Sequence, residues 1–360
     1  MINRGTDGYI QPGANVVADF ERIVLDMMMI GHPQSPSRLD PPSPQPSCGQ
    51  IDLRSLKGMY RIGTFVDQDN GRSYCILATT SIRYPWGNVI VDLDGTTTTK
   101  NLSFDCPHPM YDAETGEQGI RMLKGTTARS WIVSGSHRMA NNLHSTSFGV
   151  CQPHYSYYAS DVAHSVDNCF LSAVAAIKFY YESVVHEDYT SVQLHGMGKS
   201  TCESIDTFFS HGSCSENVPY EYTTSKTNHH HNMEKIDILQ KIALAHPSDH
   251  GRHAIASKDG SGCKLCGSTN IEGRLINGVA RNHLCDTFAS SYNGRFIQIE
   301  QKRDYRRDSF AQFWNDVFNE AYPQFSAALV VTTTTDDDDD TNCIVGDGGF
   351  CDTDRDYCSI

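Results

Sequence analysis

The stretch from residue 128 to residue 198 has the pattern strand, helix, strand, and this order constrains the fold more than any other feature. The strands are "ARSWIVSGSHR" and "YTSVQLHGMG", and the segment between them places Phe170, Val174 and Ile177 at helical spacing. Ser165 and Asp167 suit the N-terminus of this helix. Such a unit joins parallel strands by a right-handed crossover, so we expect a single α/β domain with a mostly parallel mixed sheet flanked by helices.

Other segments extend this pattern along the chain. Strands are expected in "YCILATTSI", "NVIVDL", "LSFDC" and "RFIQIEQ", and helices in "VVADFERIVLDMMMI", "NMEKIDILQKIALAH" and "DSFAQFWNDVFNEAY". The prolines of "GHPQSPSRLDPPSPQPS" fix φ and remove hydrogen-bond donors, which predicts an extended linker. We therefore expect an N-terminal helix and Pro-rich linker at 1–47, the main α/β domain at 48–330, and an Asp-rich, Cys-containing tail at 331–360.

Charge and hydropathy exclude two classes of partner. The net charge is −14 with 29 Lys and Arg residues, which argues against nucleic-acid binding, because phosphates require a positive surface. The longest apolar runs are far shorter than the roughly 18 residues that span a bilayer, so no membrane partner is expected.

The cysteines leave the compartment open. Thirteen cysteines favour a secreted or extracytoplasmic protein, but the N-terminus shows no basic start followed by an apolar segment, so no signal peptide is seen. Cys343, Cys351 and Cys358 lie in the tail, where a disulfide would act as a clamp. In "CKLCG", Cys263 and Cys266 lack a second CxxC, so a disulfide or buried thiols are favoured over a zinc knuckle. The "NHHHN" run at 228–232 is expected to be an exposed loop.

The loop "CPHPMYDAETGEQG" carries the strongest local signal for a metal. A strand leads into His108, and Asp112, Glu114 and Glu117 follow. An imidazole and a carboxylate a few residues apart can reach one metal ion from the same side. The alternative is an acidic surface loop without an ion.

Two later strands supply the other candidates. His195 ends the strand "VQLHGMG", where ligand sites of open α/β sheets lie, although a buried structural histidine is equally compatible. In "FIQIEQKRDYR", alternation puts Glu300 where an apolar side chain would face the core. An ion pair of Glu300 with Lys302, Arg303 or Arg306 is the structural alternative.

Further polar residues follow other expected elements. "WIVSGSHRMANN" ends a strand with His137, Arg138 and Asn142, and an Arg fork suits a substrate carboxylate, although a structural ion pair is the alternative. "SDVAHSVDN" places Asp161 and His164 before a helix, where they line a pocket or cap the helix. The Gly-rich segment "GSTNIEGRLING" carries Asn270 and Arg274, which are candidate substrate contacts.

Taken jointly, "HPMYDAETGEQ", "QLHG" and "FIQIEQ" resemble motifs of the zinc-carboxypeptidase-like hydrolases, particularly N-formylglutamate amidohydrolase and the poly-γ-glutamate hydrolases. The resemblance covers roughly residues 108–322 and implies the fold of that family. It implies that His108, Asp112 and His195 bind Zn²⁺ and that Glu300 is the general base. The family has Glu where this chain has Asp112, so Glu117 or Glu114 remains possible as the ligand.

The resemblance also implies a reaction. Arg138 would hold a substrate carboxylate, with His137, Asn142, His164 and Arg274 as further substrate contacts. The expected activity is zinc-dependent hydrolysis of an amide bond in an acidic N-acyl amino acid or a γ-linked peptide, so the partner would be a small molecule or peptide with a carboxylate. The competing interpretation is a secreted, non-enzymatic α/β binding domain with structural histidines, whose acidic tail contacts a partner or Ca²⁺.

Overall fold

A computed structural model describes residues 1, 3–5, 8–30, 47–95, 98–141, 144, 146–151, 157–213, 234–256 and 262–323. Residues Met1–Tyr322 form one compact unit. Most of the Pro-rich linker, the "NHHHN" run and the tail at 331–360 lie outside the described residues, and so do the three cysteines of the tail.

The elements alternate between strands and helices along most of the chain. The helices are α1 (Ala14–Met29), α2 (Thr115–Thr126), α3 (Cys169–Phe179), α4 (Lys235–Ala245), α5 (Ile271–Ile276) and α6 (Ala311–Ala321). The strands are β1 (Tyr60–Val66), β2 (Ser73–Thr79), β3 (Asn88–Asp92), β4 (Lys100–Cys106), β5 (Ala128–Val133), β6 (Thr190–Gly196), β7 (Thr207–Ser210), β8 (His253–Ile255) and β9 (Phe296–Gln301).

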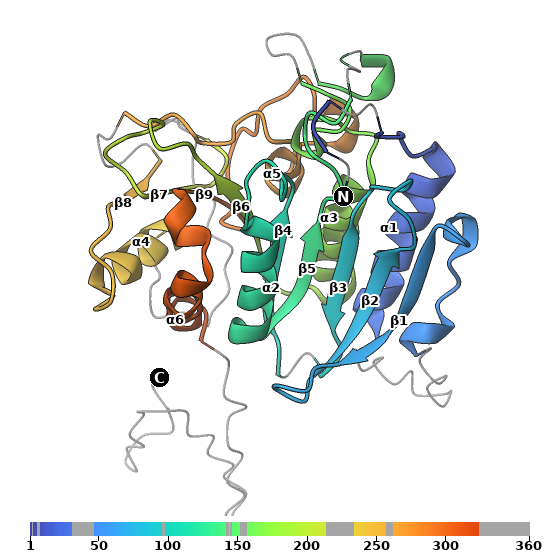
Figure 1. Cartoon of the computed structure of the whole chain (residues 1–360), viewed down its shortest axis with the longest axis horizontal. Coiled ribbons are helices and arrows are strands. Elements are labelled where there is room, and N and C mark those ends of the chain that lie inside the picture. The colour runs from blue at the N-terminus through green and yellow to red at the C-terminus, as the bar shows by residue number, and fades with distance from the viewer. Residues whose placement is uncertain are drawn as a thin grey trace, which may run out of the picture. The chain divides into compact units, whose positions relative to one another are not determined.

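All of these strands belong to one mixed sheet, with the order β1-β2-β3-β5-β4-β6-β9-β7-β8 (Figure 1). The strands β5, β4, β6 and β9 at its centre run parallel, and so do β7 and β8. The pairs β1–β2, β2–β3, β3–β5 and β7–β9 are antiparallel. The expected mixed α/β sheet is thus confirmed, with its parallel part in the middle.

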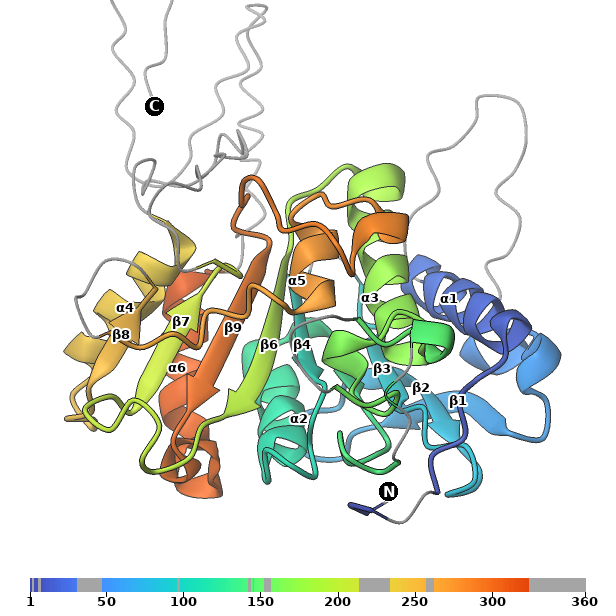
Figure 2. The same cartoon turned by 90° about the horizontal axis from the view of Figure 1, so that it is seen from above.

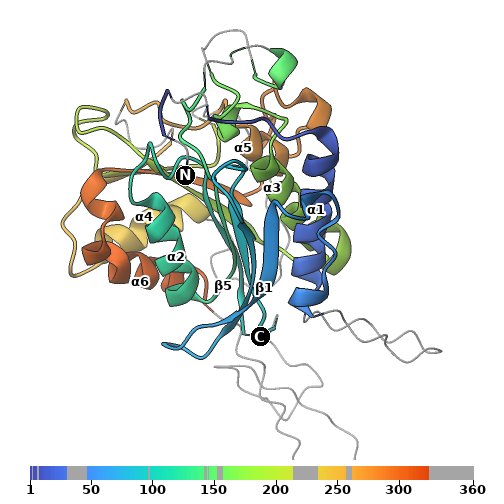
Figure 3. The same cartoon turned by 45° about the vertical axis from the view of Figure 1, so that its right-hand side comes forward.

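Helices cover both faces of the sheet (Figures 2 and 3). α1 and α3 pack against each other on one face, in a core that includes Phe20, Phe170 and the sheet residue Val89. α2, α4 and α6 cover the other face, in a core that includes Met122, Leu239 and Trp314. Because both faces are covered, the central strands are buried along nearly their whole length, as parallel strands usually are.

Helix α3 begins later than the sequence suggests. Asn168, not Ser165 or Asp167, caps it: the side-chain oxygen of Asn168 accepts a hydrogen bond from the backbone N–H of Leu171 at 2.7 Å. The expected cap was wrong because residues 162–164 form a short 3₁₀ turn, which leaves Ser165 in extended backbone three residues before the cap Asn168. The hydroxyl of Ser165 instead donates to the carbonyl oxygen of Ala159.

Between pairs of described residues, three disulfides join distant parts of the chain: Cys48–Cys75, Cys151–Cys285 and Cys202–Cys263. Cys263 of "CKLCG" therefore takes part in a disulfide, one of the two outcomes expected for it. In the described part of the chain, no helix is long and apolar enough to cross a membrane.

Candidate metal centre

The site lies where the parallel strands end. β4 leads into His108, His195 is the penultimate residue of β6, and Glu300 is the penultimate residue of β9. The backbone N–H of Asp112 donates to the carbonyl oxygen of His108 at 2.7 Å, so the loop after β4 folds back on itself. This turn brings the side chain of Asp112 toward both histidines.

His108, Asp112 and His195 form one buried group. Oδ2 of Asp112 lies 3.6 Å from Nδ1 of His108 and 3.3 Å from Nδ1 of His195. One ligand atom from each residue lies within 4.8 Å of the others. Glu114 instead pairs with Arg303 at 3.0 Å, and Glu117 is exposed on α2. Of the three acidic candidates in this loop, Asp112 is the one that faces the histidines.

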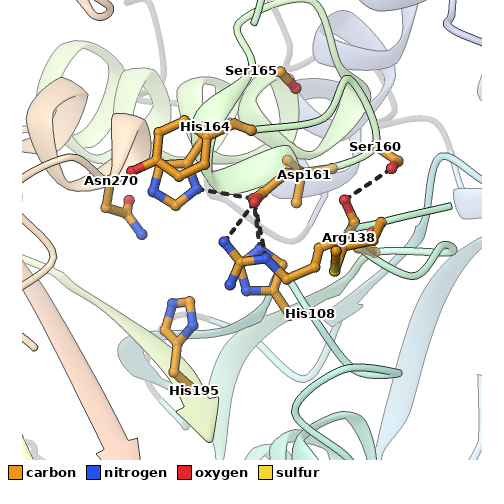
Figure 4. A network of polar contacts seen from close by, with 12 residues as sticks. His108, Arg138, Ser160, Asp161, His164, Ser165, His195 and Asn270 are labelled. Carbon is orange, nitrogen blue, oxygen red and sulfur yellow. Dashed lines mark hydrogen bonds and ion pairs between the residues drawn. The ribbon is translucent and has the colours of Figure 1, made fainter. Parts of the chain in front are cut away.

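Asp161 fixes the orientation of His108 (Figure 4). Its Oδ1 lies 2.9 Å from Nε2 of His108 and 3.0 Å from Nδ1 of His164, and its Oδ2 accepts two hydrogen bonds from Arg138 at 2.9 and 2.6 Å. Burial raises the pKa of Asp161, but the charges of His164, Arg138 and His108 outweigh burial and hold that pKa well below the ordinary value. An ionised carboxylate accepts only, so Nε2 of His108 carries a proton.

The remaining ring nitrogen of His108, Nδ1, is buried and faces Asp112 at 3.6 Å. Among the described residues it has no hydrogen-bond partner. Hydrogen-bond acceptors that converge in a buried site need a cation between them. The neighbouring His108 and His195 outweigh burial and lower the pKa of Asp112. Two imidazole nitrogens and one carboxylate oxygen are also a donor set that suits Zn²⁺, so these residues fit a divalent metal.

Glu300 lies beside this group on the neighbouring strand. It is the register partner of His195, and its Oε1 accepts a hydrogen bond from Nε2 of Gln298 at 3.1 Å. Burial raises the pKa of Glu300 to about 7. A carboxyl group with a pKa near neutrality can both accept and return a proton at physiological pH.

The ion-pair alternatives for Glu300 are not formed. Nζ of Lys302 donates to the carbonyl oxygens of Gly198, Lys199 and Thr201. Arg303 pairs with Glu114. Within the described residues no salt bridge reaches Glu300, so its carboxylate is available for chemistry.

Arg306 also lies at the site, although the sequence suggested it only as an ion-pair partner. Its Nη1 donates to the carbonyl oxygen of Ala113 at 2.9 Å, and its buried Nε has no hydrogen-bond partner among the described residues. A Cβ on Gly196 would lie 2.1 Å from Nη1, so a glycine after His195 is needed to admit this guanidinium. Burial lowers the pKa of Arg306, whereas the charges of Asp112, Glu114 and Glu300 raise it. Arg306 therefore adds positive charge beside the metal group.

Arg138 and His137 follow β5 and reach the same region. Arg138 forms the structural ion pair with Asp161 that was the alternative to a substrate contact, and its guanidinium also lies over the ring of Tyr111 at 5.3 Å. The Arg138 side chain stays 23% exposed, so part of its fork can still meet a ligand. His137 is buried, and its Nδ1 accepts from the backbone N–H of Met139 at 3.0 Å.

The other expected substrate contacts are distributed differently. Nε2 of His164 lies 3.2 Å from the hydroxyl of Thr269, and the His164 ring stacks on Tyr157. Arg274 donates to the carbonyl oxygens of Ser268, Leu284 and Cys285, so it holds its own loop together and is not part of the metal group. Asn142 lies outside the described residues.

Gln193 and Glu272 were not singled out by sequence reasoning. Oε1 of Gln193 lies 2.8 Å from Nε2 of His195 and accepts from Asn270, while its Nε2 lies 3.5 Å from Oε2 of Glu272. Asn270 therefore contacts a neighbour of a candidate ligand. A polar residue two positions before a histidine on a buried strand was the one available signal for Gln193.

Comparison with known proteins finds similar solved structures only. No family model and no curated protein matches the chain. It is similar to a bacteriophage poly-gamma-glutamate hydrolase (14% identity, 65% of this chain and 87% of that chain covered, TM-score 0.31). It is also similar to a succinylglutamate desuccinalase from Vibrio parahaemolyticus (12%, 73% and 77%, TM-score 0.36) and a metallo-carboxypeptidase from Burkholderia cenocepacia (9%, 75% and 66%, TM-score 0.29).

These structures include the kinds of enzyme that the sequence motifs resemble.

Proposed function

We propose that this chain is a Zn²⁺-dependent hydrolase that cleaves an amide bond in an acidic N-acyl amino acid or a γ-linked peptide. The observation that carries the proposal is the convergence of Nδ1 of His108, Nδ1 of His195 and Oδ2 of Asp112 on one buried point. A purely structural histidine pair has no need of a buried nitrogen that lacks a hydrogen-bond partner.

His108, Asp112 and His195 would hold the metal. A bound Zn²⁺ would polarise the scissile carbonyl and lower the pKa of a water molecule toward about 7. Asp161 accepts from Nε2 of His108, which leaves Nδ1 as the nitrogen that would bind the metal.

Glu300 would move the proton. Its carboxylate accepts a proton from the attacking water and returns it to the leaving amine, a role worth roughly 10²–10⁴-fold in rate. Two features support this role: Glu300 lies opposite His195 in the sheet, and burial raises its pKa to about 7.

Charge favours an acidic substrate. Arg306 is almost fully buried at the site, and no described residue forms a hydrogen bond with its Nε. Arg138 is partly exposed, and only Nε and Nη2 of its guanidinium donate to Asp161. Guanidinium groups pair well with carboxylates, so either arginine would fix the carboxylate of an N-acyl amino acid or γ-linked peptide.

Zinc stoichiometry tests the proposal. The full chain is loaded with Zn²⁺, dialysed and measured by mass spectrometry, with His195→Ala as the test and His246→Ala as the control. His246 is a partly exposed histidine that pairs with Asp316. We expect about one zinc per chain in the wild type and His246→Ala, and none in His195→Ala.

Hydrolysis of N-acyl glutamates and γ-glutamyl peptides by the loaded wild type completes the test. Absence of stoichiometric zinc in the wild type would instead favour the non-enzymatic binding domain. If the wild type binds zinc but cleaves no acidic amide, the metal site is supported and the proposed substrate class is refuted.

A further inference from the structure

We propose that Asn270 and Gln193 are positioning residues that keep a proton on Nε2 of His195, so that Nδ1 of His195 presents its lone pair to the metal. The inference deepens the proposed function and rests on it for the identity of the ion. It concerns a chain of hydrogen bonds that starts at the backbone of α5 and ends at His195.

The chain of hydrogen bonds starts at a group that can only donate. The backbone N–H of Gly273 in α5 donates to Oδ1 of Asn270 at 2.9 Å. This contact fixes the amide of Asn270, because its oxygen and not its nitrogen must face Gly273. Nδ2 of Asn270 therefore points the other way, toward the side on which His195 lies (Figure 4).

The contact with Asn270 fixes the orientation of the Gln193 amide in turn. Nδ2 of Asn270 donates to Oε1 of Gln193, so this end of the Gln193 amide is the acceptor. The nitrogen at the other end faces the buried carboxyl of Glu272, at 3.5 Å. Gln193, Asn270 and Glu272 are all essentially inaccessible to solvent, so no water competes for these groups.

The last hydrogen bond joins Gln193 to His195. Oε1 of Gln193 lies 2.8 Å from Nε2 of His195. Two acceptors do not form a hydrogen bond, so Nε2 carries a proton and donates it to Gln193. The other ring nitrogen, Nδ1, faces Asp112 and the second histidine, where a metal would lie.

His108 is held in the same sense by a separate chain. Arg138 can only donate, Asp161 accepts from it, and Nε2 of His108 donates to Asp161. Two independent chains thus end with Nε2 protonated and Nδ1 directed at one point. Partners of this kind typically change metal affinity by about 10–100-fold.

Asn270→Asp tests this chain of hydrogen bonds because it replaces the donor Nδ2 of Asn270 by an acceptor oxygen and changes little else. Asp caps a helix as well as Asn does, so α5 keeps its first hydrogen bond. The new carboxylate, however, places an acceptor oxygen next to Oε1 of Gln193, which is also an acceptor. We expect the Gln193 amide to rotate so that its nitrogen donates to that carboxylate and to Nε2 of His195. Nε2 must then be unprotonated, and the imidazole proton moves to Nδ1.

Two measurements report the change. Imidazole ¹⁵N shifts of His195 in the metal-free protein should show Nε2 protonated in the wild type and unprotonated in Asn270→Asp. The Kd for Zn²⁺, measured by competition with a chromophoric chelator, should rise by about 10–100-fold. Asn277→Asp is the matched control: it lies just after α5 and loses a hydrogen bond to the carbonyl of His211, but it is outside the chain. It should leave both readouts unchanged.

A second pair of variants keeps the test open if Asn270→Asp fails to fold. Gln193→Glu retains an acceptor for Nε2 of His195 and should keep the wild-type Kd within about threefold, whereas Gln193→Met removes the acceptor and should raise the Kd by about tenfold or more. Wild-type Nε2 protonation and wild-type Kd in both Asn270→Asp and Gln193→Met would overturn the inference. Failure of the wild type to bind Zn²⁺ would refute the proposed function, while the ¹⁵N shifts would still decide the role of Asn270 and Gln193.

Discussion

His195 and Glu300 lie directly opposite each other on the neighbouring parallel strands β6 and β9. Two residues earlier on each strand, Gln193 and Gln298 are also register partners. Each glutamine hydrogen-bonds to the site residue of its own strand, at 2.8 Å and 3.1 Å. The distance between the candidate ligand and the candidate base is therefore set by the backbone of the sheet, so either side chain can be changed without moving the other.

Glu300→Gln is the first test of this arrangement. It preserves size and removes the proton acceptor, so we expect zinc content to stay near one per chain while kcat/KM falls by roughly 10²-fold or more. Glu114→Gln is the matched control, because Glu114 was the alternative acidic ligand and pairs with Arg303. The control should lose neither zinc nor rate. Retained rate in Glu300→Gln would remove Glu300 from the mechanism, and loss of both zinc and rate would make it a ligand.

The pH dependence of the reaction depends on the same carboxyl. Burial raises the pKa of Glu300 to about 7, and the base must be deprotonated to act. A metal cation nearby favours the charged form and lowers this pKa. We therefore expect kcat/KM to increase with pH through an apparent pKa at or below about 7. Glu300→Gln should abolish this acidic limb, and an unchanged limb in the variant would assign it to another group.

Strand periodicity and topology are the parts of this fold that the sequence predicts well. The buried strands β4, β6 and β9 have clear patterns, and parallel order places their carboxyl ends at one edge of the sheet. That rule brings His108 and His195 to the same edge, whereas the choice of Asp112 rests on the family resemblance, with Glu114 and Glu117 left as alternatives. The strands β7 and β8 escaped prediction, because four and three residues are too few for an alternation to be recognised.

Contacts between loops could not be predicted. Asp161 orients His108 from 53 residues away, and Asn270 contacts Gln193 across 77 residues. No local spacing connects such pairs, since their meeting depends on how α3, α5 and the sheet pack. Arg274, which a Gly-rich loop suggested as a substrate contact, donates to nearby backbone carbonyls, and no feature of the sequence indicated these contacts either.

Arg138 needs a test that separates its ion pair from a substrate contact. Arg138→Gln leaves Asp161 without its bidentate partner, so zinc affinity should fall modestly. If Arg138 also binds a substrate carboxylate, KM should rise by about tenfold or more for an N-acyl glutamate but not for the analogue whose carboxylates are amidated. An equal effect on both substrates would restrict Arg138 to holding Asp161. The exposed Arg281, which pairs with Glu21, provides the control Arg281→Gln.

The last prediction concerns a buried carboxyl away from the metal. Asp105 on β4 is fully buried, and the hydroxyls of Ser103 and Ser191 donate to it. Burial raises the pKa of Asp105 to about 6, above its ordinary value near 3.8. Between pH 4 and 6 the folded chain holds a proton that the unfolded chain has lost, so this group makes the protein less stable as pH rises through that range.

Asp105→Asn removes the charge that burial disfavours. At pH 7 we expect the variant to be more stable than the wild type by on the order of 1–3 kcal/mol, and the difference should vanish below about pH 4, where both side chains are neutral. Asp188→Asn is the control of opposite sign, because Lys235 and Arg295 lower the pKa of Asp188 despite its burial. It should lose stability at pH 7. Urea unfolding of the metal-free proteins with disulfides intact, at pH 4 and pH 7, measures both effects, and a pH-independent difference between Asp105→Asn and the wild type would contradict the raised pKa of Asp105.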